Sequence, residues 1–150
     1  YCSRVGPTLK QLMKDYPKDL KIVFKQQPLP FHKDARPAAK ASLAAHKQGK
    51  FWEYHDVLFE NMKKLKQDNL EEYAKGLKLN MKKFKKDMAD PALEEQVKRD
   101  QALAAKIGAR GTPTSFVNGY MVRGAQPVAA FKKIIDRELA KAKAGKGKKK

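Results

Sequence analysis

The chain has 150 residues, 41% of them hydrophobic, which suits a single globular domain with a substantial core. No apolar run approaches the roughly 18 residues of a membrane-spanning helix, and a single cysteine, Cys2, excludes an intrachain disulfide framework. The 34 Lys and Arg against 16 Asp and Glu give a net charge of +18. This excess attracts nucleic acid, anionic membranes or acidic proteins and does not choose among them.

The first predicted element is a helix that begins at Cys2, because Val5, Leu9 and Leu12 follow it at helical spacing. Free N–H groups and the helix dipole in a first turn stabilise a thiolate, which is the reactive form of cysteine. The alternative is that Cys2 is a small buried hydrophobe, as most free cysteines are. Taken alone, this stretch favours the alternative.

Residues 20–24 are rich in β-branched and aromatic side chains and predict a short strand, which the prolines Pro28 and Pro30 end. Helical patterns then fill the middle of the chain. Asp68 is the expected N-cap of one helix, with Glu71 in the capping-box position. The helices are expected at about 37–48, 51–62, 68–77, from Asn80 to 88, and from Asp90-Pro91 to 107.

The last third changes period. Residues 114–117 and 120–123 predict two strands, and Asn118-Gly119 between them is a strong signal for a two-residue hairpin. A final helix is expected from Val128, with apolar residues such as Phe131 on its buried face. Six lysines lie in residues 141–150, a segment expected to be a basic, disordered tail.

These elements do not make a satisfactory sheet. The strand at 20–24 has only a hairpin far away in the sequence as its partner, and three or more strands are usually needed for a stable sheet. The pattern therefore asks for one more strand, and no unassigned segment of the sequence supplies it.

Three stretches together resemble the DsbA-like branch of the thioredoxin superfamily. The first is Tyr1-Cys2-Ser3-Arg4-Val5 with Pro7-Thr8-Leu9 behind it. The second joins Pro28-Leu-Pro-Phe-His32 and Ala35-Arg-Pro-Ala-Ala39 with the stretch from Gly49 to Asp56. The third is Gly108-Ala-Arg-Gly111-Thr112-Pro113-Thr114-Ser115-Phe116-Val117-Asn118-Gly119. The likeness extends over the chain to about Leu139.

The resemblance implies an α/β fold of the thioredoxin type that is interrupted by an all-helical insertion. The thioredoxin-like core would comprise residues 1–32 and 108–140, the helical insertion residues 33–107, and the basic tail residues 141–150. Family members carry Cys-x-x-Cys at the start of the first long helix, and Tyr1-Cys2 resembles its second half. We therefore expect Cys2 to be the resolving thiol and the nucleophilic cysteine to fall two residues before Tyr1.

The missing strand fits the same expectation, because the strand that precedes the motif lies at the centre of the family's sheet. Its absence would leave a slot about twice the 4.8 Å strand spacing, lined by unpaired N–H and C=O groups. An upstream segment with a strand and the first cysteine, or a strand donated by a partner chain, is expected to fill it.

Thr112-Pro113 matches the family loop in which a cis proline faces the cysteines and receives an extended substrate. An ordinary trans proline opening a strand is the alternative; the family context favours cis. Thr112 would then lie against the nucleophilic cysteine.

Other candidate sites are weaker. Phe31, Trp52, Tyr54 and Phe59 could line a peptide groove, but helical spacing favours the core, and Trp52 and Phe59 are expected there. The three histidines, His32, His46 and His55, lack the spacing of metal ligands, so a metal is not expected. The sequence has no Gly-rich phosphate loop, and no cofactor is expected. The lysines from Lys63 to Lys86 are expected to be a solvated face rather than a nucleic-acid surface.

The resemblance implies a thiol-disulfide oxidoreductase of the periplasm or an equivalent space, which exchanges disulfides with cysteine-containing secreted polypeptides. Its oxidising partner would be a membrane quinone reductase, and a chain without the first cysteine could not complete the cycle alone. Two competing functions remain open. One is a basic module on a redox-inactive thioredoxin scaffold that binds nucleic acid or an acidic partner, and the other is a glutathione-dependent relative of the same fold.

Overall fold

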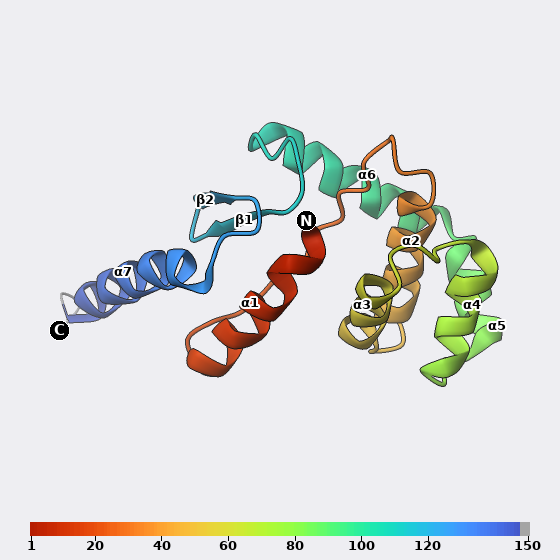
Figure 1. Cartoon of the computed structure of the whole chain (residues 1–150), viewed down its shortest axis with the longest axis horizontal. Helices are drawn as coiled ribbons and strands as arrows, with labels where there is room; N and C mark the ends of the chain where they lie inside the picture. Colours follow the sequence, from red (N-terminus) through yellow and green to blue (C-terminus); the bar gives the residue numbers. More distant parts are fainter. Residues whose placement is uncertain (148–150) are drawn as a thin grey trace. The chain divides into compact units, whose positions relative to one another are not determined.

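The computed structural model describes residues 1–147 and divides the chain into two compact units (Figure 1). The hairpin unit combines Tyr1–Phe24 with the chain from Gly111 onward, and the helical unit is Lys25–Arg110. The helical unit thus covers the predicted insertion, 33–107, and extends beyond it at both ends. No helix among the described residues is long and apolar enough to cross a membrane.

The helical unit contains five helices: α2 (Ala35–His46), α3 (Phe51–Glu60), α4 (Gln67–Gly76), α5 (Met81–Met88) and α6 (Pro91–Lys106). Buried alanines line α2, and their small side chains let the other helices pack closely around it. Tyr54, Leu70 and Phe84 are fully buried in the same core. The Tyr54 hydroxyl donates to the Leu70 carbonyl oxygen at 2.8 Å, and burial raises the pKa of that phenol.

The helix starts predicted at Asn80 and at Asp90-Pro91 are confirmed. Asn80 Oδ1 accepts the Lys83 N–H at 2.9 Å before α5, and Asp90 Oδ1 accepts the Ala92 N–H at 2.9 Å where Pro91 opens α6. The predicted Asp68 cap is wrong, because α4 begins at Gln67 after Lys66, whose side chain makes no cap. The Glu71 carboxylate bonds Gln67 and Lys85 instead of closing a capping box.

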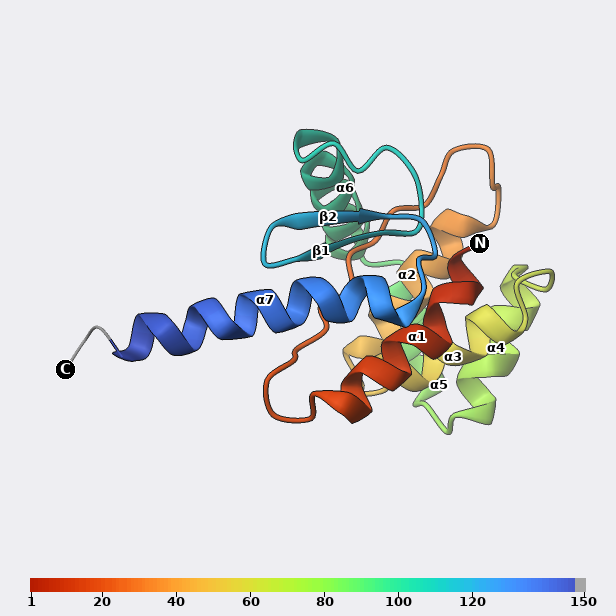
Figure 2. The same ribbon diagram turned by 60° about the vertical axis from the view of Figure 1, so that its left-hand side comes forward.

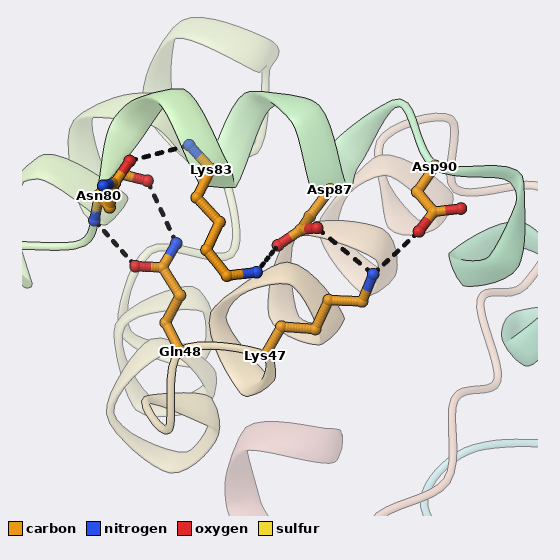
Figure 3. A network of polar contacts seen from close by, with 6 residues as sticks. All are labelled: Lys47, Gln48, Asn80, Lys83, Asp87 and Asp90. Atoms are coloured by element: carbon orange, nitrogen blue, oxygen red, sulfur yellow. Dashed lines mark hydrogen bonds and ion pairs between the residues drawn. The ribbon is translucent and has the colours of Figure 1, made fainter.

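A polar network joins the end of α2 to α5 and to the start of α6 (Figure 3). Lys47 Nζ lies 3.3 Å from an Asp87 oxygen and 2.9 Å from an Asp90 oxygen. Lys83 reaches the other Asp87 oxygen at 2.7 Å, and Gln48 exchanges two hydrogen bonds with the Asn80 backbone. The hydrogen bond from Lys83 and the neighbouring Lys47 hold the pKa of Asp87 below its usual value. Each oxygen of this mostly buried carboxylate is therefore paired with a lysine ammonium group.

A second network holds the extended start of the helical unit. The Gln26 N–H donates to Asp100 Oδ2 at 2.9 Å, and its side-chain amide donates to Ser42 Oγ at 2.9 Å. Asp100 is 5% exposed and Gln26 is 6% exposed. Gln101 adds a 2.9 Å bond to the Pro28 carbonyl oxygen. Two side chains of α6, Asp100 and Gln101, thus satisfy backbone groups that no neighbouring strand bonds among the described residues.

The hairpin unit contains α1 (Cys2–Asp15), β1 (Thr114–Val117), β2 (Tyr120–Arg123) and α7 (Val128–Gly147). The strands are antiparallel, with Thr114 opposite Arg123 and Val117 opposite Tyr120. Asn118 and Gly119 both have positive φ, 47° and 88°, as a type I′ turn requires. The predicted hairpin is confirmed to the residue.

A small core holds these elements together, made by Val5, Leu12, Val122, Phe131 and Ile135. At the far end of α1, Asp15 pairs with Lys132 at 2.7 Å, and the Tyr16 hydroxyl donates to Asp136 Oδ1 at 2.6 Å. This hydrogen bond to a carboxylate raises the pKa of Tyr16 to about 12. Both contacts join α1 to α7.

A clasp centred on Tyr120 joins the hairpin to α7. The Arg137 guanidinium lies 4.1 Å from the centre of the Tyr120 ring, within the range of a cation–π contact. Lys141 Nζ donates to the Tyr120 hydroxyl at 3.1 Å and also contacts Glu138 at 3.2 Å. The beginning of β2 is therefore fixed to the middle of α7.

The predicted strand at 20–24 does not form. The sheet among the described residues has only β1 and β2, so residues 20–24 have no ladder to join. Val23 and Phe24 are accordingly 65% and 37% exposed.

The predicted disorder of residues 141–150 is contradicted as far as Gly147, because α7 continues to that residue. Alanines favour a helix, and lysines near its C-terminus interact well with the helix dipole. Residues 148–150 lie outside the described part of the chain.

The predicted core position of Trp52 is also wrong, since Trp52 is 45% exposed. Helix α3 buries Tyr54 completely, and a residue two positions earlier lies about 200° away around the helix. Phe59, the other aromatic residue expected in the core, is half-buried.

Candidate functional site

Cys2 is the first residue of α1, directly after the N-cap Tyr1. Its thiol is free and its side chain is neither fully buried nor fully exposed. The Arg4 N–H donates to the Tyr1 carbonyl oxygen at 3.0 Å, and the Arg4 guanidinium lies 5.1 Å from the centre of the Tyr1 ring. These contacts order the turn that carries the thiol. The interpretation of Cys2 as a fully buried core residue is therefore not supported.

Thr112 and Pro113 lie in the loop that leads into β1, within the same unit as Cys2. The peptide bond between them is cis. The Pro113 carbonyl oxygen accepts the Gly124 N–H at 2.9 Å, and Thr114 Oγ1 donates to the Gly111 carbonyl oxygen at 2.7 Å. The first bond ties the loop to the residue after β2, and the second joins the start of β1 to the beginning of the loop.

These bonds identify which backbone groups of the loop remain open. Pro113 has no N–H, and its carbonyl oxygen already accepts a bond from Gly124. The backbone of Thr112 makes no hydrogen bond to any described residue, and its side chain is half-buried. Thr112 rather than Pro113 therefore offers a backbone donor and a free acceptor at this position.

Strand β1 has an open edge. Hydrogen-bonded pairs alternate along an antiparallel ladder, and the bond between Gly124 and Pro113 fixes which pairs they are. Ser115 and Val117 thus bond β2, whereas the backbone groups of Thr114 and Phe116 point away from it. No described strand lies on that side. The open edge begins directly after the Thr112–Pro113 loop.

The sequence indicated Cys2, Thr112 and Pro113, and the structure gathers all three in the hairpin unit. It did not indicate Gly124, which extends the ladder by one residue and bonds Pro113; its φ is positive, 76°. A glycine directly after a predicted strand was the available signal.

The remaining candidate residues lie in the helical unit. The rings of Phe51, Trp52, His55 and Phe59 contact one another on α3. His55 Nδ1 lies 3.1 Å from Asp56 Oδ1, and Phe31 is 72% exposed near the start of the unit. Among residues 1–147, no group of three His, Cys, Asp or Glu side chains is placed to hold a metal ion.

Comparison with known families now decides the assignment. The model of the DSBA-like thioredoxin domain matches residues 1–136. The chain belongs to this DsbA-like family. The helical unit corresponds to the helical insertion of DsbA-like proteins, so the predicted fold class is confirmed.

Individual relatives agree with this assignment. A thioredoxin-like oxidoreductase from Silicibacter pomeroyi has a solved structure with a TM-score of 0.85 and 26% identity, covering 93% of this chain and 80% of that one. The probable disulfide bond formation protein D of Bacillus cereus is 33% identical over 118 residues, covering 73% of this chain and 54% of its own length.

Further relatives carry a different name. The Na(+)/H(+) antiporter NhaA of Herminiimonas arsenicoxydans is 35% identical over 136 residues, which is 91% of this chain. The chain spans only 22% of the length of that antiporter. The similarity therefore concerns only a part of a much longer protein.

Proposed function

We propose that this domain performs thiol-disulfide exchange with cysteine-containing polypeptides, with Cys2 as the resolving thiol. The observation that carries the proposal is the place of Cys2 at the first residue of α1 in a DsbA-like domain. Exchange requires a thiolate and a second thiol that releases the mixed disulfide. Cys2 supplies one of these two sulfurs. In the family pattern the other belongs to a cysteine that lies two positions upstream of Tyr1.

In the oxidising direction, the two protein sulfurs begin as a disulfide. A substrate thiolate attacks the sulfur of the first cysteine, and Cys2 Sγ leaves as a thiolate. A second substrate thiolate then attacks the substrate sulfur of the mixed disulfide and releases the first cysteine. The substrate loses two thiol protons and two electrons, and the protein gains both as two thiols.

The substrate would lie as an extended strand beside Thr112. The free N–H and C=O of this residue suit the main-chain bonds of an extended peptide. Side chains of the peptide would not need a particular sequence, because main-chain bonds supply the contact. This suits an activity on many different polypeptides.

The open edge of β1 supports a further part of the proposal. The outward backbone groups of Thr114 and Phe116 can pair with a strand from the same protein or from a partner chain. Pairing would convert the two-stranded hairpin into a larger sheet, which is the more stable arrangement. Phe116, which is 37% exposed, would gain cover.

We also propose a compartment and a redox partner, and both rest on the family resemblance alone. We place the domain in the periplasm or another extracytoplasmic space, where disulfides persist. A quinone reductase of the membrane would reoxidise the pair after each cycle.

The test is insulin reduction and oxidation of a dithiol peptide by the longest natural form of the protein. We expect turnover, and we expect Cys2→Ser to stop it and to accumulate a mixed disulfide that gel electrophoresis detects without reductant. Equal turnover in the wild type and the Cys2→Ser variant would refute the role of Cys2. Turnover that requires glutathione would favour the glutathione-dependent alternative. Absence of redox activity in the wild-type protein would refute the exchange activity and favour the alternative of a basic binding module.

A further inference from the structure

The second half of α7 leaves the protein core and carries lysines. Val128, Phe131, Ile135 and Leu139 form the buried stripe of this helix. The stripe would continue at positions 142 and 146, but these are Ala142 and Lys146. The helix therefore has no bulky apolar side chain to bury after Leu139.

The exposed end is long and regular. Residues 140–147 are all exposed, although α7 remains helical to Gly147. Figure 2 shows this part of α7 running past the end of the hairpin. We call residues 140–150 the lysine segment. It contains six lysines and no acidic residue, so it carries a third of the net charge of +18.

The lysines of α7 differ in what they contact. Lys141 is engaged by the Tyr120 hydroxyl and by Glu138, whereas Lys143 and Lys146 make no ion pair or hydrogen bond to any described residue. Three residues turn a helix by about 300°, so these two lysines point in directions only about 60° apart. Lys141 points to the opposite side of the helix from Lys143. Within the helical residues 140–147, the lysines without a described partner therefore lie on one side of the helix.

We propose that the lysine segment binds the phosphates of an anionic lipid bilayer. A one-sided set of cations matches a flat surface of phosphates better than the two walls of a nucleic-acid groove. The segment also has no arginine, aromatic or amide side chain that could bond or stack on bases. Clusters of four to eight lysines are typical of segments that bind anionic lipids.

The binding is electrostatic and reversible. An amphipathic helix inserts through Trp, Phe or Leu side chains, and beyond Leu139 this segment has only Ala, Gly and Lys. Each lysine near an anionic surface contributes a factor of about five in partitioning. Raising the salt from about 0.1 M to 1 M shortens the Debye length from about 10 Å to 3 Å and should release the protein.

The experiment measures sedimentation of the protein with vesicles that contain 30% phosphatidylglycerol in phosphatidylcholine, and with vesicles of phosphatidylcholine alone. In the segment variant, Lys143, Lys146 and the three lysines 148–150 become Gln. The matched control changes five exposed lysines of the helical unit, Lys63, Lys64, Lys66, Lys82 and Lys106, to Gln. Both variants have the same net charge, +13, since each loses five of the +18 charges.

We expect binding to the anionic vesicles alone, at least a hundredfold loss of partitioning in the segment variant, and a much smaller loss in the control. Circular dichroism establishes that both variants keep their helices. Absence of binding, or equal losses in the two variants, would overturn the proposal. Tighter binding to duplex DNA at equal accessible phosphate would overturn it in favour of nucleic acid. The Cys2→Ser variant should bind like the wild type, so this result does not depend on the redox proposal.

Discussion

The chain around Gln26 in the helical unit and strand β1 in the hairpin unit differ in what their backbones bond. The Gln26 N–H donates to a buried aspartate, Asp100, and no strand of the described residues lies beside it. Thr114 and Phe116 have neighbours on one side only, and their outward groups bond no described strand. The backbone at Gln26 is thus hydrogen-bonded by side chains of its own unit, whereas the outer edge of β1 can still pair with another strand.

This difference matches the roles that we assign to the two units: the helical unit supports the fold, and the hairpin unit carries the proposed binding site. The helical unit meets its polar requirements internally, through Asp100 and through the network around Asp87. In the hairpin unit, no described residue bonds the backbone groups at the loop and edge where we propose that polypeptides bind. Open groups of this kind cost stability unless a partner or water pairs them. We therefore expect core changes to affect both units similarly, and polar changes to affect the helical unit more.

The largest expected effect comes from Phe84→Ala. Phe84 is fully buried, and its ring centre lies 5.9 Å from that of Tyr54. Truncation of a buried phenylalanine leaves a cavity and typically costs about 3–5 kcal/mol. Hydrogen exchange should show the loss of protection in α2, α4 and α5. Phe31→Ala, at a residue 72% exposed, is the matched control and should change stability little. Equal effects of the two variants would contradict the assignment of the core.

An intermediate effect is expected from Asp100→Ala. This change removes the acceptor of the Gln26 N–H and leaves that buried donor without a partner. Such a loss costs about 1–3 kcal/mol, measurable by urea denaturation. Asp100→Asn keeps one acceptor oxygen and should recover part of the loss. Asp19→Ala, at an exposed site, is the control. A neutral Asp100→Ala variant would show that side chains do not close this backbone.

The smallest effect is expected from Tyr16→Phe, which removes the hydroxyl bonded to Asp136 in the hairpin unit. The folded-state pKa of Tyr16, about 12, lies above its ordinary value of 10.0. This contribution to stability is therefore complete below about pH 10 and is lost as the pH rises toward 12. The stability difference between wild type and variant, from denaturation at several pH values, should shrink over this window. A difference that stays constant to pH 12 would contradict the contact.

The parts of the fold that depend on local signals were predictable from the sequence. Asn118-Gly119 specified the hairpin and its register, since few residues accept positive φ at both turn positions. Asn80 and Asp90 marked the starts of two helices for a similar reason, because their side chains accept the free N–H groups there. The resemblance to the DsbA-like family rested on three sequence stretches taken together, and the family model, which matches residues 1–136, bears it out.

The parts that depend on partners distant in the sequence were not predictable. Residues 20–24 have strand-like composition, but a strand forms only where a ladder is present. Asp68 has the character of a cap, yet Glu71 bonds Gln67 and Lys85 instead. At the candidate site, Cys2 and Thr112-Pro113 could be identified from the sequence. The open backbone of Thr112 could not, because it follows from the bond between Gly124 and Pro113.

The clasp at Tyr120 has a consequence for any strand that joins β1. With Arg137 over its ring and Lys141 on its hydroxyl, the beginning of β2 cannot slide or twist freely along α7. The hairpin thus keeps one inclination to the helix before a strand arrives. An incoming strand meets an edge whose orientation is already set, so less orientational entropy is lost on docking.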